Sequence, residues 1–305
     1  MSFKFLFKSC LQGMLFHTAY FVGNAVSSVI GKLFSTILLE RFIKYRNSYC
    51  PDPPNQLGCT KKAQTYDHIF TMKTIASKYK IKRKPVYAVF VDFKKAFDSV
   101  CRQALFLKLA QNGVTGNFYK TLRNMYSNSF AYIKLSGHIS KRIKILKGTE
   151  QGHPLSPDLF KVFLTDLSPQ LEFPNCPVLD KVKVSHLLWA DDLILLSLDQ
   201  RTCQMQLDRL SHFCRSWGIE INESKTQVVI FGASSVDRIN VNFLLNGKSL
   251  KIVDNYCYLG IDLHYSGNMK PAQQNLKTKA MRAFFWTQTL SHEIEIIIQS
   301  SHNFI

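Results

Sequence analysis

Two adjacent aspartates interrupt a long apolar stretch of the chain. Asp191 and Asp192 separate the arm Leu187–Ala190 from the arm Leu193–Leu196. Apolar arms of this length are typical of buried strands, so the pattern predicts a hairpin with the acids at its turn. A carboxylate is costly to bury unless a cation neutralises it, so the pair indicates a cation site. An Asp-Asp turn at the protein surface is the alternative, and this segment alone does not separate the two.

A third aspartate follows a second apolar run. The β-branched and aromatic residues Val86–Val91 precede Asp92 and predict a buried strand that ends in a carboxylate. Phe93–Asp98 then has the composition of a helix start. Asp92 at a strand end and Asp191 at a hairpin tip can meet at one site. Carboxylates there would suit two divalent cations about 3.5–4 Å apart, the arrangement that clamps the reacting oxygens in phosphoryl transfer. The alternative for Asp92 alone is a helix N-cap.

A third segment makes the pattern of the three aspartates much more specific. It is Gly148–Phe160, a turn-rich loop before an apolar helix over Phe160–Leu167. With it, the chain resembles the reverse transcriptases of non-LTR (LINE-type) retrotransposons from about Asn24 to about Leu263. The motifs follow in the family's order and spacing. They are Phe90–Asp98 and Trp189–Asp192 as catalytic motifs, the loop Gln151–Pro157, the segment Gly218–Thr226, the primer-grip segment Tyr258–Gly260, and Ser28–Phe34 and Tyr66–Phe70 in the fingers.

The resemblance implies a function for each carboxylate. Asp92 and Asp191 would hold two metal ions, with Asp192 as the third carboxylate and the carbonyl of Phe93 as a further oxygen ligand. Mg²⁺ is the implied ion, with Mn²⁺ as a substitute, since hard divalent cations bind oxygen. The implied reaction is attack of a primer 3′-hydroxyl on an α-phosphate, where catalysis is mostly positioning and charge stabilisation.

The resemblance also implies substrate contacts. Phe97 stands where the family has an aromatic residue under the incoming sugar, which excludes the 2′-hydroxyl that distinguishes RNA from DNA. It would therefore select deoxynucleotides; a core aromatic on an amphipathic helix is the alternative. The other implied contacts are Gln151 and Gly152 with template or nucleotide, Lys225 with the triphosphate, and Tyr258, Leu259 and Gly260 with the primer. By composition alone, Lys225 is an ordinary surface lysine.

The sequence departs from the family pattern in the fingers. Where the family has a Gly-Phe-Arg-type segment after a glutamine, Gln56 is followed by a segment with Thr60 at the arginine position. Lys61 or Lys62 would be the candidate substitute for binding the phosphates, although a lysine lacks the bidentate fork of arginine. Glu150 stands where a basic residue is common. We also expect a truncated domain without an upstream endonuclease or a full thumb, for which processive synthesis is not expected.

The charge of the chain suits a polyanionic partner. Lys and Arg number 39 against 21 Asp and Glu, a net charge of +18. Basic clusters of this kind are often solvated faces, but beside the acidic residues they predict a nucleic-acid channel. The resemblance implies that its partners are an RNA template, a DNA primer and dNTPs. The clusters are Lys73–Lys84, Lys141–Lys147 and Lys270–Arg282.

Cysteine usage and the first residues bear on localisation. The eight cysteines include no CxxC pair, which fits reduced thiols in an intracellular protein of the nucleus or cytoplasm. Ser9–Gly31 lacks Asp, Glu, Lys and Arg, so a signal or membrane segment is the alternative. Polar residues such as Gln12, His17 and Asn24 make it a poor membrane span, and we expect no stable membrane association.

The predicted fold is α+β, a right-hand polymerase palm with an antiparallel sheet backed by helices, partial fingers and a truncated thumb. The predicted divisions are a divergent segment 1–23, a reverse transcriptase domain 24–265 and a thumb-like helical tail 266–305. Within the domain, the fingers comprise about 24–85 and 101–147, and the palm about 86–100 and 148–265. Two helices have predicted inward faces. They are Val29–Tyr45, through Ile30, Leu33, Phe34, Ile37, Leu38 and Phe42, and Arg201–Gly218, through Met205, Leu207, Leu210, Phe213 and Trp217.

Two functions remain open at this point. The first is an RNA-directed DNA polymerase domain, which the intact acid set favours. The second is a truncated, non-catalytic transposon-derived relic that at most binds nucleic acid, which the altered fingers and the missing thumb favour.

Overall fold

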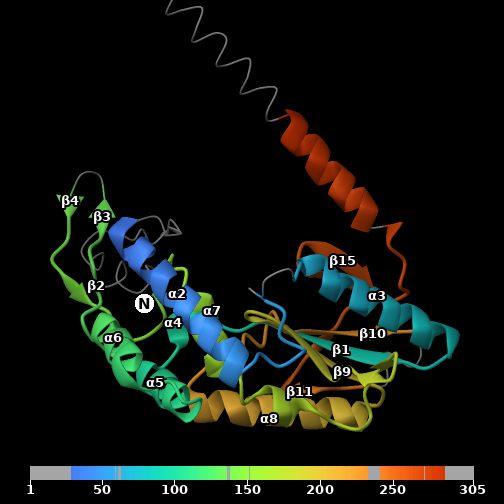
Figure 1. Cartoon of the computed structure of the whole chain (residues 1–305). Helices are drawn as coiled ribbons and strands as arrows, with labels where there is room; N and C mark the ends of the chain where they lie inside the picture. The colour runs from blue at the N-terminus through green and yellow to red at the C-terminus, as the bar shows by residue number, and fades with distance from the viewer. Residues whose placement is uncertain are drawn as a thin grey trace, which may run out of the picture.

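A five-stranded sheet forms the centre of the molecule, which is described here from a computed structural model (Figure 1). The strand order is β13-β10-β1-β9-β8; neighbours are antiparallel except for the parallel pair β10 and β13. The strands are β1 (Val86–Val91), β8 (His186–Trp189), β9 (Asp192–Ser197), β10 (Gln227–Phe231) and β13 (Lys251–Ile252).

The structure describes residues 29–58, 60, 63–135, 138–150, 152–232, 241–270 and 272–285. The divergent segment 1–23, residues 286–305 of the predicted tail, and the side chains of Lys61, Lys62 and Gln151 lie outside the described residues. The domain boundaries given above stay predictions.

The two faces of β1 pack into different parts of the core because side chains alternate along a strand. Ala88 and Phe90 join a cluster with α3 (Thr65–Ile81). Val89 and Val91 join a larger cluster on the opposite face. That second cluster includes α8 (Gln200–Trp217), α7 (Ser156–Leu164), α5 (Arg102–Gln111) and α6 (Gly116–Ser127). Helices therefore cover both faces, with α3 and α8 on opposite sides of the sheet (Figure 1). This agrees with the predicted α+β palm.

Helix α8 confirms most of its predicted inward face. The Oδ1 of Asp199 accepts a hydrogen bond from the N–H of Thr202 at 2.7 Å and caps the helix. Gly218 ends it in the left-handed conformation with a φ of 71°. Leu207, Leu210 and Phe213 are buried and Trp217 is partly buried, but the prediction was wrong for Met205, which is 41% exposed.

The fingers side consists of helices and short hairpins. Here α2 (Val29–Tyr49) contacts α6 through the stacked rings of Phe42 and Phe118, whose centroids are 5.6 Å apart. The predicted inward face of α2 was largely wrong, because Ile30, Leu33, Phe34 and Ile37 are exposed. The residues it buries are Ser35, Leu38, Phe42 and Arg46. Also on this side are α4 (Ala96–Ser99), the strand pair β2 (Phe130–Ala131) with β5 (Ile143–Lys144), and the pair β3 (Lys134–Leu135) with β4 (His138–Ile139).

The last part of the chain adds hairpins at one side of the palm. They are β11 (Leu244–Leu245) with β12 (Lys248–Ser249), and β14 (Asn255–Tyr258) with β15 (Ile261–His264). A helix over residues 272–285 follows, in the region of the predicted thumb-like tail (Figure 1). Of the helices in the described ranges, none combines the length and apolar character that a membrane crossing requires.

Candidate active site

The strand register places the aspartates of the two predicted catalytic motifs side by side. Val91 pairs with Leu193 across β1 and β9, so the next residues along, Asp92 and Asp192, face each other at the end of the sheet. Directly opposed residues in antiparallel strands have Cα atoms about 4.5–5.5 Å apart. The end of β1 and the start of β9 thus bring together acids that lie a hundred residues apart in the sequence.

A two-residue turn holds the remaining acid. Trp189 pairs with Asp192, which leaves Ala190 and Asp191 as the turn between β8 and β9. Ala190 has a φ of 55°, a left-handed conformation that costs about 1–2 kcal/mol for a residue with a Cβ. The predicted hairpin with acids at its turn is therefore present, and its backbone is held in a strained form.

Burial and the neighbouring acids raise the pKa values of two of the three carboxyl groups. Burial raises the pKa of the Asp191 carboxyl, and the charge of Asp92 raises it further. Asp192 keeps part of its surface open to solvent, yet burial of its carboxyl together with Asp191 and Asp92 raises its pKa to about 6. Like charges in a partly buried site favour proton uptake unless a cation is close.

The donor set fits hard divalent ions. All three side chains supply carboxylate oxygens, and the raised pKa values of Asp191 and Asp192 mark an uncompensated negative site that a cation would relieve. Nowhere in the described ranges do three or more Asp, Glu, His or Cys side chains form a preassembled metal cluster. Mg²⁺ sites usually combine one or two carboxylates with water and substrate phosphate, so a complete protein cage is not required.

Phe93, whose carbonyl the resemblance implies as an oxygen ligand, lies next to the segment that follows α8. Phe93 and Ile221 form an antiparallel bridge. Its hydrogen bonds run from Lys94 N–H to Glu220 O at 2.8 Å and from Asn222 N–H to Asp92 O at 2.7 Å. The N–H and C=O of Phe93 therefore point away from Ile221.

The segment after α8 is bound directly to Asp92. The hydroxyl of Thr226 accepts a hydrogen bond from the Asp92 N–H at 3.2 Å, next to the bond from Asn222. Lys225 lies in the tight turn between these two residues, where its N–H bonds to Asn222 O at 3.1 Å and its side chain is exposed. The turn brings Lys225 into the neighbourhood of the acids and leaves its ammonium in solvent.

The loop of Gly152 packs against the helix that follows Asp92. Thr149 N–H bonds to Phe97 O at 2.9 Å, and a Cβ on Gly148 would lie 2.9 Å from the backbone of Asp98. The ring of Phe97 is half-buried against Phe160 of α7, with centroids 4.7 Å apart. A half-buried ring in this position is compatible with an aromatic residue that faces the sugar and with a core residue. Gly152 has a φ of 82°, a conformation that glycine adopts without strain.

Glu150 occupies the position where the family commonly has a basic residue. Its carboxylate accepts a hydrogen bond from the Ser129 hydroxyl and lies 3.2 Å from His153 Nε2. Its backbone carbonyl accepts from the Ser156 hydroxyl at 2.5 Å. Glu150 therefore connects the fingers to the start of α7.

The predicted primer-grip residues form the turn of the β14–β15 hairpin. Leu259 and Gly260 have φ angles of 46° and 84°. Tyr258 is buried, and its hydroxyl lies 2.9 Å from Nδ1 of His68 in α3. The His68 ring stands edge-on to Trp189 at 5.5 Å, so a row of aromatic rings connects the β14–β15 hairpin to the β8–β9 hairpin. Burial and the nearby Asp192 raise the pKa of Tyr258.

Sequence comparison decides the family. Residues 24–263 match the family described as reverse transcriptase (RNA-dependent DNA polymerase). The chain belongs to this family. The predicted resemblance to LINE-type reverse transcriptase domains is confirmed by its relatives.

One relative is a retrovirus-related Pol polyprotein from the type-1 retrotransposable element R2 of Popillia japonica, 27% identical over 205 residues. The alignment covers 65% of this chain and 34% of that polyprotein. Another is the RNA-directed DNA polymerase from the mobile element jockey of Drosophila melanogaster, 24% identical over 263 residues, or 83% of this chain and 28% of the relative. The reverse transcriptase domain described here thus spans about a third or less of the length of these relatives.

A solved structure shares the fold. Telomerase from Candida tropicalis, in complex with a fragment of telomeric RNA, superposes with a TM-score of 0.55 at 14% identity. The match covers 80% of this chain and 38% of that chain. It supports the polymerase palm assigned to this reverse transcriptase domain.

A cluster of buried charges anchors the fingers to the palm of the reverse transcriptase domain. Arg46 of α2 pairs with Asp52 and, at 3.3 Å, with Asp158 of α7. Lys161 of α7 lies 3.2 Å from both Asp52 and the hydroxyl of Thr60. Thr60, at the family's arginine position, is therefore engaged with the palm. No role could be predicted for these charges from the sequence, since nothing local distinguishes them from surface residues.

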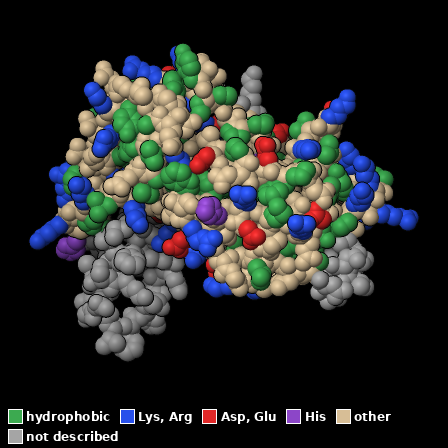
Figure 2. Space-filling model, turned by 90° about the horizontal axis from the view of Figure 1, so that it is seen from below, with side chains coloured by type: hydrophobic (Ala, Val, Ile, Leu, Met, Phe, Trp, Pro, Cys, Tyr) green, Lys and Arg blue, Asp and Glu red, His purple; other side chains and the backbone are tan. Residues whose placement is uncertain are grey.

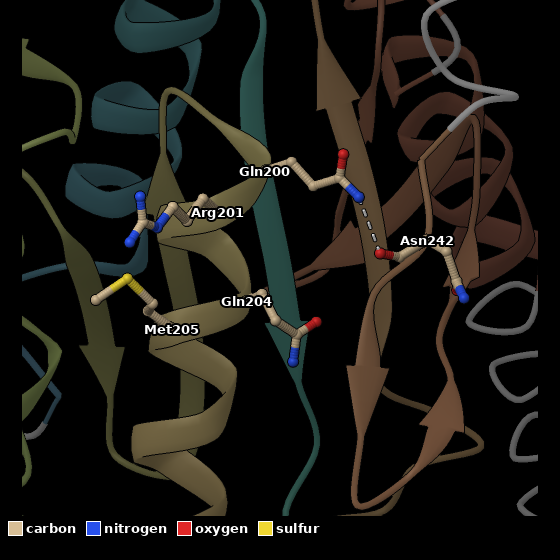
Figure 3. A pocket seen from close by; sticks show the side chains of 5 residues that line it. All are labelled: Gln200, Arg201, Gln204, Met205 and Asn242. Carbon is tan, nitrogen blue, oxygen red and sulfur yellow. Dashed lines mark hydrogen bonds between the residues drawn. The ribbon is translucent and has the colours of Figure 1, made fainter.

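The cavity beside α8 is not part of the site. It measures about 480 Å³ and is lined by Gln200, Arg201, Gln204, Met205 and Asn242 (Figure 3). Gln204 exchanges two hydrogen bonds with Leu244, and Gln200 donates to Asn242 O, so these amides hold β11. The cavity lies at the far end of β9 from Asp192, about 20 Å away for a six-residue strand.

Basic side chains are prominent on the surface. On the face seen from below, Lys and Arg outnumber Asp and Glu and gather toward both ends (Figure 2). Lys94 lies 3.4 Å from Glu220 beside the Asp92 loop, at an exposed site. The predicted nucleic-acid channel stays a prediction.

Proposed function

We propose that this chain is an RNA-directed DNA polymerase domain that adds deoxynucleotides to a primer 3′-hydroxyl on an RNA template. One observation carries the proposal: the β1–β9 register that brings Asp92 opposite Asp192 and next to the Asp191 turn. Membership of the reverse transcriptase family supports the same reading.

Asp92, Asp191, Asp192 and the carbonyl of Phe93 would hold two Mg²⁺ or Mn²⁺ ions. Such ions, when bound, stabilise charge on the reacting phosphate oxygens and favour ionisation of the attacking hydroxyl. The protein itself supplies the fixed placement of the acids at the end of β1 and at the tight turn. Positioning of this kind is a large part of catalysis in phosphoryl transfer.

Further residues would bind the substrates. Phe97 would pack under the sugar of the incoming nucleotide, and Gln151 with Gly152 would position that nucleotide or the template. Lys225, with its exposed ammonium, would contact the triphosphate and donate a proton to the pyrophosphate leaving group. Lys61 and Lys62 would bind the phosphates in place of arginine, and the Tyr258–Gly260 turn would hold the primer.

The test is primer extension on an RNA template with Mg²⁺ or Mn²⁺. We compare the unaltered chain with Asp191→Asn, and with Asp208→Asn as a matched control on the exposed side of α8. Extension by the unaltered chain and the control, but not by Asp191→Asn, supports the proposal. Equal extension by all three variants would contradict it.

The alternative is a non-catalytic relic that binds nucleic acid. The threonine at the family's arginine position favours it. It predicts a folded chain that binds primer–template with strong salt dependence and makes no product with either metal.

A further inference from the structure

The segment Asn55–Gly58 lies against the outer strand of the catalytic hairpin. Leu57 N–H bonds to Leu188 O at 3.0 Å, and Leu188 N–H bonds to Asn55 O at 2.8 Å. Gln56 and Leu188 form a parallel bridge between these two bonds. The edge of β8 is thus covered by a stretch of chain that the sequence places more than a hundred residues earlier.

The side chain of Gln56 reaches from this segment to the turn itself. Its Oε1 accepts hydrogen bonds from the N–H of Gly58 at 3.1 Å and from the N–H of Ala190 at 3.3 Å. Gln56 is only 4% exposed. Two N–H donors at one atom fix the amide orientation, because a flipped amide would bring its NH₂ group against both of them.

Gly58 shows how closely the two backbones approach. A Cβ at this position would lie 2.2 Å from Ala190 N and 2.8 Å from the carbonyl carbon of Trp189. No side chain fits there, so the segment rests directly on the turn. Ala190 is the residue with the unfavourable φ, and strained backbone persists only where its surroundings hold it.

We propose that Gln56 is a positioning residue that fixes the catalytic turn through the Ala190 N–H. By holding that N–H, it would set the placement of Asp191 relative to Asp92. It would also link this placement to the fingers, because the same segment continues to Thr60, which contacts Lys161 of the palm. The inference rests on the proposed polymerase function.

The experiment replaces the amide by an isosteric side chain without an acceptor, Gln56→Met. The matched control is Gln206→Met, since Gln206 is also fully buried and donates to the carbonyls of Ser185 and Leu196 away from the turn. Gln56→Glu keeps an acceptor oxygen at the same position. Gln56→Asn, which withdraws the oxygen by one methylene, replaces Gln56→Met if that variant does not fold.

Two quantities are measured on each folded variant. The first is hydrogen exchange of the Ala190 amide, resolved by NMR, which needs no catalysis. We expect exchange to accelerate at least about fivefold in Gln56→Met, as loss of a hydrogen bond predicts, and to stay unchanged in Gln56→Glu and Gln206→Met. The second is single-nucleotide incorporation, for which we expect a rate loss of about 10–100-fold in Gln56→Met only, with unchanged primer–template affinity.

The outcomes separate this inference from the proposed function. If the unaltered chain makes no product, the polymerase proposal fails, and the exchange of the Ala190 amide still decides whether Gln56 holds the turn. Unchanged exchange in Gln56→Met, or equal acceleration in Gln206→Met, would overturn the positioning role. Faster exchange with an unchanged incorporation rate would show that the contact is structural only.

Discussion

Two buried histidines, His68 and His186, should make this protein sensitive to mild acid. Neither side chain has measurable exposure, and burial lowers the pKa of each from 6.5 to about 4. In the unfolded chain each imidazole takes up a proton near its ordinary pKa. Because the folded pKa is depressed, the stabilisation is fully present above pH 6.5 and is lost progressively as the pH falls toward 4.

The size of the effect follows from the two pKa values. A pH of 5 is about 1.5 units below the unfolded pKa of each histidine and still above its folded pKa. Each histidine therefore lowers the free energy of unfolding by about 2 kcal/mol at this pH. The two together cost about 4 kcal/mol between pH 7 and pH 5. That is a large part of the 5–15 kcal/mol by which domains are typically stable.

Urea unfolding at pH 7 and pH 5 measures this difference. We expect His68→Asn and His186→Asn each to reduce the pH-dependent loss of unfolding free energy by about 2 kcal/mol. The exposed His212 of α8 provides the control, and His212→Asn should leave the loss unchanged. A double variant of His68 and His186 with the same pH dependence as the unaltered chain would refute the reasoning.

Three further substitutions test the packing around the site. Tyr258→Phe leaves His68 without its buried partner, so the free energy of unfolding should fall by about 1–3 kcal/mol in urea titrations. Gly148→Ala should cost about 1–2 kcal/mol for its φ of 84° alone, plus the contact with α4 at 2.9 Å, and should lower the melting temperature. Phe97→Val should raise ribonucleotide incorporation relative to deoxynucleotide incorporation; if it only lowers stability, the ring that packs on Phe160 is a core residue.

Local patterns in the sequence were sufficient for the sheet and the hairpin. The β-branched and aromatic run Val86–Val91 and the apolar arms around Asp191 depend on neighbours in the chain, so the strands beside the acids could be placed without tertiary information. Helix α8 could be predicted for the same reason, because its cap, its apolar stripe and its terminal glycine all lie within or next to the helix. The roles of the site residues stay predictions that the proposed experiments address.

The buried face of α2 could not be read in the same way. Four of the six apolar residues on its predicted face point to solvent, whereas Arg46 is buried because Asp52 and Asp158 neutralise it. A hydrophobic pattern cannot anticipate this, since the acids come from a loop and from α7. The same reasoning explains why Gln56 had no predicted function: its significance arises from Ala190, which only the folded chain brings near.

The turn between β8 and β9 is held by contacts from three elements, and none of these described contacts brings a compensating positive charge. Strand β1 fixes its register, Gln56 binds Ala190 from the outer edge, and the ring of His68 contacts Trp189 from behind. None of the described Lys, Arg or His side chains forms an ion pair with the three acids. Neutral supports can hold mutually repelling carboxylates in place without neutralising them. Under the proposed function, that negative charge would bind the divalent cations, and a framework already in place would need little rearrangement when they bind.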